Sequence, residues 1–225
     1  MSAVNQYDSL GRTIRKTSNT AVVAYEYDTA TDSKGEPVLG QLASQTRTQG
    51  GGDYTTTILE YDIAYRPLRT QVTLPAVGDL ASLTKRDFVT EFSYTADGQI
   101  KTVKLPQITK GGAKDGGANV LGAETVTTYY DAASRAQWMA GGFGWGTYVA
   151  DSVHDFAGRP LVHDLGTTYG AAVSYSYDPT TQLLTRIALD REQYSGTDLD
   201  VAYSYDDAGN LVSAFDVPSN KAANL

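Results

Sequence analysis

Short segments in which apolar and polar residues alternate recur along this chain. In the segment VSYSY at 173–177, valine and two tyrosines alternate with two serines, and the segment LRTQVTL at 68–74 alternates in the same way. A period of two, carried by β-branched and aromatic residues, is typical of strands. No window shows a comparable helical period, so the sequence predicts an all-β fold.

A Tyr-Asp dipeptide marks the end of many of these segments. Two degenerate copies, Tyr94-Thr95 and His154-Asp155, fill gaps between the intact ones, and the spacings between successive second residues are 20, 34, 33, 36, 24, 23 and 28. A regular unit that recurs at variable spacing predicts repeated antiparallel hairpins with loops of unequal length. We expect residues 1–225 to form a single region of about eight repeat units, a fragment of a much larger protein. The intact copies are Tyr7-Asp8, Tyr27-Asp28, Tyr61-Asp62, Tyr130-Asp131, Tyr177-Asp178 and Tyr205-Asp206.

The residues after each tyrosine have the chemistry of a turn. DSLG at 8–11 has aspartate first and glycine fourth, the preference of a type I turn, and such a turn followed by a left-handed residue closes many hairpins. DFAG at 155–158 and DDAG at 206–209 repeat this recipe, whereas DPTT at 178–181, DAAS at 131–134 and DIAY at 62–65 lack the glycine. The predicted structural turn residues are Asp8, Gly11, Asp28, Asp62, Gly98, Asp131, Asp155, Gly158, Asp178, Asp206 and Gly209.

The composition argues against some classes of partner and excludes some kinds of bond and metal site. The chain has 16 tyrosines against 5 phenylalanines, which suits surfaces that are only half buried. A net charge of −8 argues against a nucleic-acid partner, and the absence of cysteine excludes disulfides and thiolate metal sites. No stretch approaches a membrane span and Met1 is followed by polar residues, so we expect no signal peptide within this chain.

Few patterns suggest a ligand site. The glycine-rich segment 110–122 lacks the Gly-Lys-Ser/Thr ending of a phosphate loop, so we interpret it as a flexible connection. In WMAGGFGWG at 138–146, Trp138, Phe143 and Trp145 could stack on a sugar or on cargo, but packing against neighbouring strands is favoured.

Nothing in the sequence argues for catalysis. The only histidines are His154, which replaces a repeat tyrosine, and His163, and a metal site would need a third ligand. No Ser-His-Asp arrangement or nucleophile elbow is present, and no glycosidase carboxylate pair can be singled out. We therefore predict no catalytic residue, no metal and no cofactor.

Tyr-Asp-x-x-Gly-Arg units flanked by alternating segments resemble the YD repeats of the Rhs family. The resemblance is carried by YDSLGRTIRKTS at 7–18, HDFAGRPLVHDL at 154–165 and YDDAGNLVSAFD at 205–216, and it runs across nearly the whole chain. The family includes bacterial polymorphic toxins, the shell-forming subunits of insecticidal Tc toxins and, more distantly, teneurins. It implies a long β-sheet that spirals into a hollow shell, which in bacterial members encloses a toxic C-terminal polypeptide. This chain departs from the pattern by having fewer repeats and no Asp-Pro-x-Gly-Leu segment of the type linked to self-cleavage.

The expected function is therefore structural and non-enzymatic. We expect a curved, spiralling sheet of hairpins, part of an Rhs-like wall that is secreted or displayed at the cell surface in the full-length bacterial protein. Its expected partners are neighbouring YD repeats and a toxin polypeptide cargo, with self-association through sheet edges. One alternative is a surface module whose aromatic residues recognise a glycan or a cell-surface receptor, and a second is an enzyme acting on carbohydrate. Further repeats followed by a variable C-terminal domain would indicate the container, whereas a membrane anchor would indicate adhesion.

Overall fold

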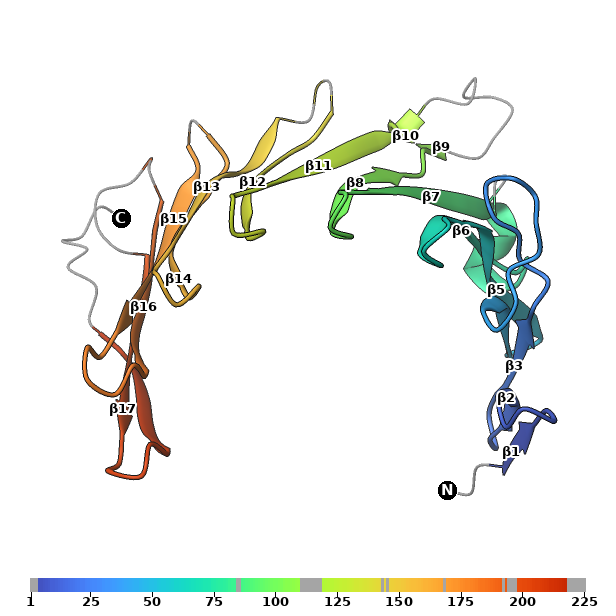
Figure 1. The fold of residues 1–225 in the computed structure, drawn as a ribbon, viewed down its shortest axis with the longest axis horizontal. Helices are drawn as coiled ribbons and strands as arrows, with labels where there is room; N and C mark the ends of the chain where they lie inside the picture. The colour runs from blue at the N-terminus through green and yellow to red at the C-terminus, as the bar shows by residue number, and fades with distance from the viewer. Residues whose placement is uncertain are drawn as a thin grey trace. The chain divides into compact units, whose positions relative to one another are not determined.

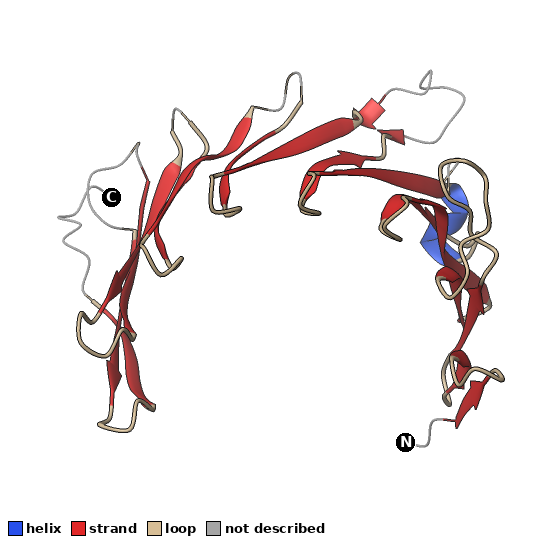
Figure 2. Cartoon of the chain, viewed as in Figure 1, coloured by secondary structure: helices blue, strands red, loops and turns tan. Residues whose placement is uncertain are grey.

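The computed structural model describes residues 4–83, 86–109, 119–142, 144, 146–167, 169–191, 193 and 198–217. Apart from one 3-10 turn, η1 (Gly78–Ser82), the regular elements of this described part are β-strands (Figure 2). The contacts divide the chain into two compact units, residues 1–125 and 126–225, and each unit is described by itself. The predicted all-β class is confirmed.

The first unit contains eight strands that pair in chain order, each antiparallel to the next (Figure 1). A two-stranded ribbon, β9 (Ile108–Thr109) with β10 (Asn119–Leu121), is separate from this sheet. The eight strands are β1 (Val4–Tyr7), β2 (Thr13–Thr17), β3 (Val22–Tyr27), β4 (Leu42–Gln49), β5 (Gly52–Tyr61), β6 (Pro67–Thr73), β7 (Asp87–Tyr94) and β8 (Ile100–Leu105).

The second unit repeats this arrangement with eight more antiparallel strands in chain order. These strands are β11 (Glu124–Tyr130), β12 (Ala136–Ala140), β13 (Thr147–His154), β14 (Pro160–Leu165), β15 (Ala171–Tyr177), β16 (Leu184–Arg191), β17 (Leu199–Tyr205) and β18 (Leu211–Asp216). Within each unit the sheet is twisted, as strands of L-amino acids require (Figure 1). Repeated antiparallel hairpins are therefore the building plan of both units.

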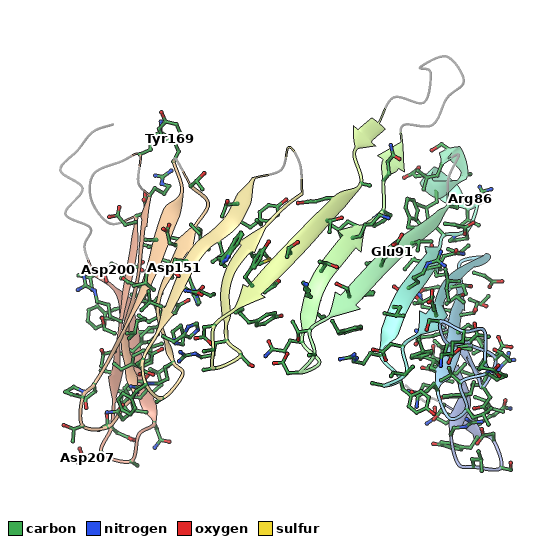
Figure 3. The ribbon with its side chains drawn as sticks, turned by 45° about the horizontal axis from the view of Figure 1, so that its top comes forward. Arg86, Glu91, Asp151, Tyr169, Asp200 and Asp207 are labelled. Carbon is green, nitrogen blue, oxygen red and sulfur yellow. The ribbon has the colours of Figure 1, made fainter. Side chains whose placement is uncertain are left out.

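This simple order places all the Tyr-Asp turns of a unit at the same end of its strands. Because consecutive strands are neighbours, successive connections alternate between the two ends of the strands. In the second unit, Asp207 in the β17–β18 turn lies at one end, and Tyr169 between β14 and β15 lies at the other (Figure 3). The repeat therefore presents a row of chemically similar turns at one end of the strands.

Both sheets bury little of their surface. None of the described side chains is fully buried, and the buried hydrophobic residues form one cluster in the first unit: Ala30, Val38, Ala43 and Tyr61, with Ile58 packed against it. This cluster includes two residues of the long connection 28–41, in which the Val38 amide donates to the Ala30 carbonyl at 2.9 Å. A sheet usually buries one face against another layer. Here most apolar side chains along the strands remain half exposed.

Candidate functional site

The turn after each repeat tyrosine is built around the aspartate carboxylate. In the first copy, Asp8 Oδ1 accepts hydrogen bonds from the amides of Leu10 and Arg12, both at 2.9 Å, and the Gly11 amide donates to the Asp8 carbonyl at 3.0 Å. One carboxylate oxygen therefore satisfies two backbone donors that the tight turn leaves without strand partners. The same pair of carboxylate contacts occurs at Asp62, Asp131, Asp155 and Asp206.

The fourth turn position adopts a left-handed backbone, with or without glycine. Gly98 and Gly209 have φ of 94° and 82°, and the non-glycine residues Tyr65 and Ser134 have φ of 61° and 60°. The copies at Asp62 and Asp131 therefore form the same turn at the expense of some backbone strain. Gly11 and Gly158 complete the predicted glycine set, with φ of 78° and 84°.

Three copies vary the turn. At Thr95 the hydroxyl Oγ1 takes the place of the carboxylate and accepts from the Gln99 amide at 3.0 Å. The turn at Asp178 is one residue longer: here the amide of Gln182 donates to the Asp178 carbonyl, at 2.9 Å, and Gln182 is the residue with positive φ, at 64°. Asp28 departs further, since it opens the long connection 28–41 instead of a tight turn. The repeat thus keeps the strand pairing while the connection changes.

The left-handed position gives a direct test of the turn. We expect Gly209→Val to destabilise the chain by about 1–3 kcal/mol, because a β-branched residue is forced into positive φ. Space is not the obstacle, since the closest atom to an added Cβ is Leu183 Cδ1 at 3.9 Å. Ser204→Thr, a change within β17, is the matched control and should alter stability far less. Urea unfolding of both variants measures the difference, and equal midpoints would rule out the turn assignment.

The arginine that follows the turn links one hairpin to the next. Arg159 Nε donates to Asp155 Oδ2 at 2.7 Å, within its own turn, and Nη1 donates to the Gln182 carbonyl of the next turn at 2.9 Å. Its guanidinium carbon lies 4.3 Å from the ring centroid of Tyr177. The Tyr177 hydroxyl in turn donates to the Pro160 carbonyl at 3.0 Å. We call this arrangement the Asp–Arg–Tyr clamp. It consists of the aspartate and arginine of one Tyr-Asp turn and the tyrosine that precedes the next Tyr-Asp turn along the chain.

The clamp recurs along both units. Arg12 binds Asp8 and also forms a two-pronged pair with Asp28, at 2.9 and 2.7 Å, while stacking on the Tyr27 ring. Arg66 stacks on Tyr94 in the same manner. Five repeat tyrosines donate their hydroxyl to the carbonyl of the first strand residue after the preceding Tyr-Asp connection, at 2.7–3.0 Å. These bonds run from Tyr27 to Thr13, Tyr61 to Leu42, Tyr94 to Pro67, Tyr177 to Pro160 and Tyr205 to Leu184.

The forked geometry of the arginine is expected to matter more than its charge. We expect Arg159→Lys to lower the melting temperature by about 2–4 °C, because an ammonium cannot reach both turns and stack on the ring together. Arg69→Lys is the control, since Arg69 is 47% exposed and its nearest contact with Glu60 is 3.8 Å. Thermal melts followed by circular dichroism compare the two. A similar shift in both variants would mean that the clamp adds nothing beyond charge.

Each turn carboxylate is held in its charged form. The pKa of Asp8 is lowered by the side-chain hydrogen bond from Arg12, although desolvation opposes the shift. At Asp155 desolvation is the largest single influence and raises the pKa, but the amide and guanidinium of Arg159 together outweigh it and the pKa is lowered. A carboxylate with a lowered pKa is poorly matched to proton transfer near neutral pH. The clamp is therefore suited to holding backbone in place.

The sequence-based site set contained the turn aspartates and glycines but omitted the arginines and tyrosines of the clamp. The signal was present, because the Gly-Arg dipeptide and the recurring tyrosine are part of the repeat. Their role depends on contacts with the neighbouring hairpin, however, which the sequence of one repeat does not reveal. The omitted residues with described clamp contacts are Arg12, Arg66, Arg135, Arg159, Tyr27, Tyr61, Tyr94, Tyr177 and Tyr205.

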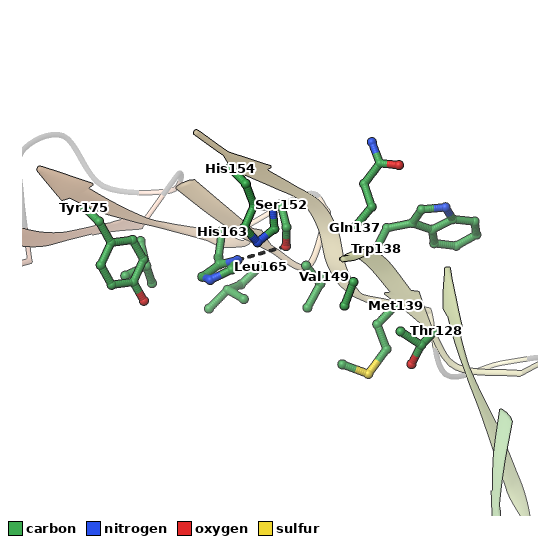
Figure 4. Close-up of a pocket in the computed structure, with 12 residues that line it drawn as sticks. Thr128, Gln137, Trp138, Met139, Val149, Ser152, His154, His163, Leu165 and Tyr175 are labelled. Carbon is green, nitrogen blue, oxygen red and sulfur yellow. Dashed lines mark hydrogen bonds between the residues drawn. The ribbon is translucent and has the colours of Figure 1, made fainter. Parts of the chain in front are cut away.

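The second unit also contains an apolar pocket of about 460 Å³ (Figure 4). Apolar side chains from four strands line it, including Met139, Val149 and Leu165. The two histidines meet here: His154 and His163 have ring centroids 6.1 Å apart, and His163 Nδ1 lies 2.9 Å from Ser152 Oγ. Among the described residues, no group of three or more His, Cys, Asp or Glu side chains could hold a metal ion.

The aromatic residues predicted as stacking candidates are only partly described. Trp138 stacks in parallel on Tyr129, with centroids 3.7 Å apart and planes 3° apart, so one face of its indole is already covered. Phe143 and Trp145 lie outside the described residues. No helix of the described part is long and apolar enough to cross a membrane.

Comparison with known proteins shows a likeness in structure alone. No protein-family model and no curated protein matches the chain. Solved structures of TcdB2-TccC3-Cdc42 and of TcdB2-TccC3 without its hypervariable C-terminal region are both similar, with 17% identity and TM-scores of 0.58. The Photorhabdus luminescens Tc holotoxin pore with the TccC3-D651A mutation is similar at 17% identity and a TM-score of 0.57. The likeness is one of fold.

These alignments cover very different shares of this chain and of the matched chains. Each alignment covers 95% of this chain but only 11% of the matched chain. The hairpin array described above therefore corresponds to a small part of the Tc toxin structures, and nearly all of the array takes part.

Proposed function

We propose that this chain is a non-catalytic wall segment of an Rhs-like toxin that encloses or presents a polypeptide cargo. The observation that carries the proposal is the Asp–Arg–Tyr clamp, which joins one hairpin to the next at Arg12, Arg66 and Arg159 by similar contacts. Such a device suits a long, repetitive sheet, because every added hairpin is fixed by its neighbour alone. The fold shared with Tc toxin structures supports this reading.

The two faces of the second unit differ in a way that suits a wall. On one face, Val173 lies between His163 and Leu189 in the cross-strand register, and Leu189 lies opposite Leu199. The other face carries acidic groups, among them Asp164 and Asp190, both opposite Ala172, and Asp200, which pairs with Arg186. An unfolded cargo exposes apolar side chains, so the apolar face and its pocket are the surface that would receive it.

The partners and location follow from this role. In the full-length protein the segment would bind neighbouring YD repeats and the carried polypeptide, and that protein would act outside the producing cell. No specific contact in the described residues favours a glycan or a receptor as the ligand. A wall function also requires no reaction, which agrees with turn carboxylates held as charged hydrogen-bond acceptors.

Limited proteolysis of the full-length protein tests this function. The reading frame on both sides of the chain is first sequenced and expressed with the chain. We expect additional Tyr-Asp hairpins, and a carried polypeptide that resists proteinase K until denaturant opens the wall. Cleavage of that polypeptide at the rate of the free peptide would overturn the proposal. A membrane anchor in place of the carried polypeptide would overturn it in favour of adhesion.

A further inference from the structure

We propose that the apolar pocket of the second unit binds an apolar polypeptide segment while its two histidines are neutral, and releases that segment when they are protonated. This inference rests on the proposed function, because it adds regulation by pH to the face that would receive the carried polypeptide. The pocket has a volume of about 460 Å³, and His154 and His163 both line it (Figure 4). They are the only two histidines of the chain.

His154 stands where the repeat has a tyrosine, since it ends β13 and directly precedes the turn aspartate Asp155. In five other copies the tyrosine at this place binds the carbonyl of the first strand residue after the preceding Tyr-Asp connection. The equivalent residue here is Ala136, which begins β12 and lines the pocket together with His154. An imidazole has no hydroxyl and is shorter than a phenol, so it fills this space less completely. The pocket therefore lies where the repeat pattern is broken.

The two imidazoles lie close together on one face of the sheet. Their ring centroids are 6.1 Å apart, and His163 also meets Tyr175 edge-on at 5.6 Å. Both histidines are half-buried, so water reaches them in the open pocket and a bound segment would exclude it. The Ser152 hydroxyl, 2.9 Å from His163 Nδ1, can donate to a neutral ring or accept from a charged ring. This hydrogen bond therefore permits both protonation states.

No carboxylate in the pocket compensates the charge of a protonated imidazole. Among the described residues, those that line the pocket from β11, β12 and β15 are apolar or uncharged polar side chains. Asp151 and Asp164 are opposite each other on β13 and β14, and they are the sequence neighbours of Ser152 and His163. Because successive residues of a strand alternate between faces, these two aspartates belong to the opposite face.

The charged groups next to His154 are already paired. Asp155 Oδ2 accepts from Arg159 Nε at 2.7 Å, and Arg135 Nε donates to Asp131 Oδ2 at 2.7 Å. Arg135 also reaches the residue that follows His154, because its Nη1 donates to the Asp155 carbonyl at 3.1 Å. These two ion pairs add no net charge, so protonation of both histidines leaves the pocket positively charged.

A covered pocket therefore favours the neutral histidines. A segment that excludes water from the two rings disfavours their charged form, and two like charges at this separation also repel each other. The affinity for an apolar segment is then full where imidazole is neutral, and it is lost as pH falls through the range in which imidazole is protonated. An acidic environment would loosen the hold of this face on the carried polypeptide.

Fluorescence titration with N-phenyl-1-naphthylamine, an apolar probe that stays uncharged in this pH range, tests the inference. We expect the dissociation constant to rise about tenfold or more between about pH 7.5 and about pH 5.5, because imidazole is mostly neutral at the first value and mostly charged at the second. In the double variant His154→Gln, His163→Gln the ratio of the two constants should fall to about one, whatever the affinity at neutral pH. Each single variant should keep part of the dependence, and these decide the matter if the double variant does not fold.

A second pair of variants locates the probe. Val173→Lys places a permanent positive charge in the pocket, and we expect it to weaken binding about fivefold or more at neutral pH. Val212→Lys is the matched control, because it adds the same charge at a residue of β18 that is 67% exposed and does not line the pocket. It should leave the dissociation constant unchanged. Circular dichroism shows whether each variant is folded.

The outcomes separate this inference from the wall function. Equal dissociation constants at the two pH values, or a pH dependence that persists without the histidines, overturn the inference. It is also overturned if the probe does not bind at neutral pH, or if the two lysine variants weaken binding equally. Protease protection of the carried polypeptide is measured separately on the full-length protein at neutral pH. The pH dependence can therefore fail while the wall function stands, and the reverse.

Discussion

Replacing Tyr61 by alanine is expected to destabilise the first unit by about 3–5 kcal/mol, the largest effect of any single substitution considered. Tyr61 is 3% exposed and packs with Ala30, Val38 and Ala43 in the one buried cluster of the described residues. Its hydroxyl donates to the Leu42 carbonyl at 2.8 Å. The variant therefore leaves a cavity and an unsatisfied acceptor where the connection 28–41 covers β4 and β5.

Two further variants divide this effect into its parts. Tyr61→Phe keeps the packing and loses one hydrogen bond, so it should cost about 1 kcal/mol. Tyr169→Ala, at a residue 71% exposed, should cost little. Urea unfolding, with hydrogen exchange of β4 and β5 to locate the loss, measures all three. Equal midpoints for Tyr61→Ala and Tyr169→Ala would show that the cluster does not stabilise the fold.

Acidification is expected to unfold the hairpin array below about pH 4, where carboxylates become protonated. The pKa of each repeat aspartate is lowered in the folded state by hydrogen bonds from backbone amides or from side chains of its own or a neighbouring connection. A lowered folded pKa means that the contribution to stability is present above the unfolded value of 3.8 and is lost as pH falls through the folded pKa. The residues concerned are Asp8, Asp28, Asp62, Asp131, Asp155, Asp178 and Asp206.

Thermal melts between pH 2.5 and pH 7 measure this dependence. We expect the melting temperature to be nearly constant above about pH 5 and to fall toward pH 2.5, because the seven repeat aspartates become protonated. Asp155→Asn should be less stable at pH 7 and should show a smaller fall on acidification. An unchanged melting temperature at pH 2.5 would mean that the charged form of the turn aspartates is not needed.

The strands and most turns could be predicted because their causes are local. Alternation within a strand needs only the residues of that strand, and the turn at Asp8 needs only the aspartate and the glycine at position 11. The copies at Asp62 and Asp131 lack the glycine, yet Tyr65 and Ser134 adopt the left-handed backbone. Strand pairing on both sides of the turn compensates for that strain.

The clamp and the buried cluster could not be predicted in the same way. Arg159 contacts Gln182, a residue 23 positions away in the connection between β15 and β16, and that contact depends on the register between β14 and β15. The connection 28–41 folds back over its own sheet, which no period in the sequence reveals. The approach of His154 to His163 has a simpler origin, because β13 and β14 are the two strands of one hairpin.

Electron cryo-microscopy of the full-length protein tests the wall function most directly. We predict a continuous sheet in which further hairpins join this segment through Asp–Arg–Tyr clamps, with density for a carried polypeptide against the apolar face that includes Val173 and Leu189. A structure in which that face is covered by a folded domain of the same protein, or is open to solvent with no polypeptide enclosed, would contradict the account.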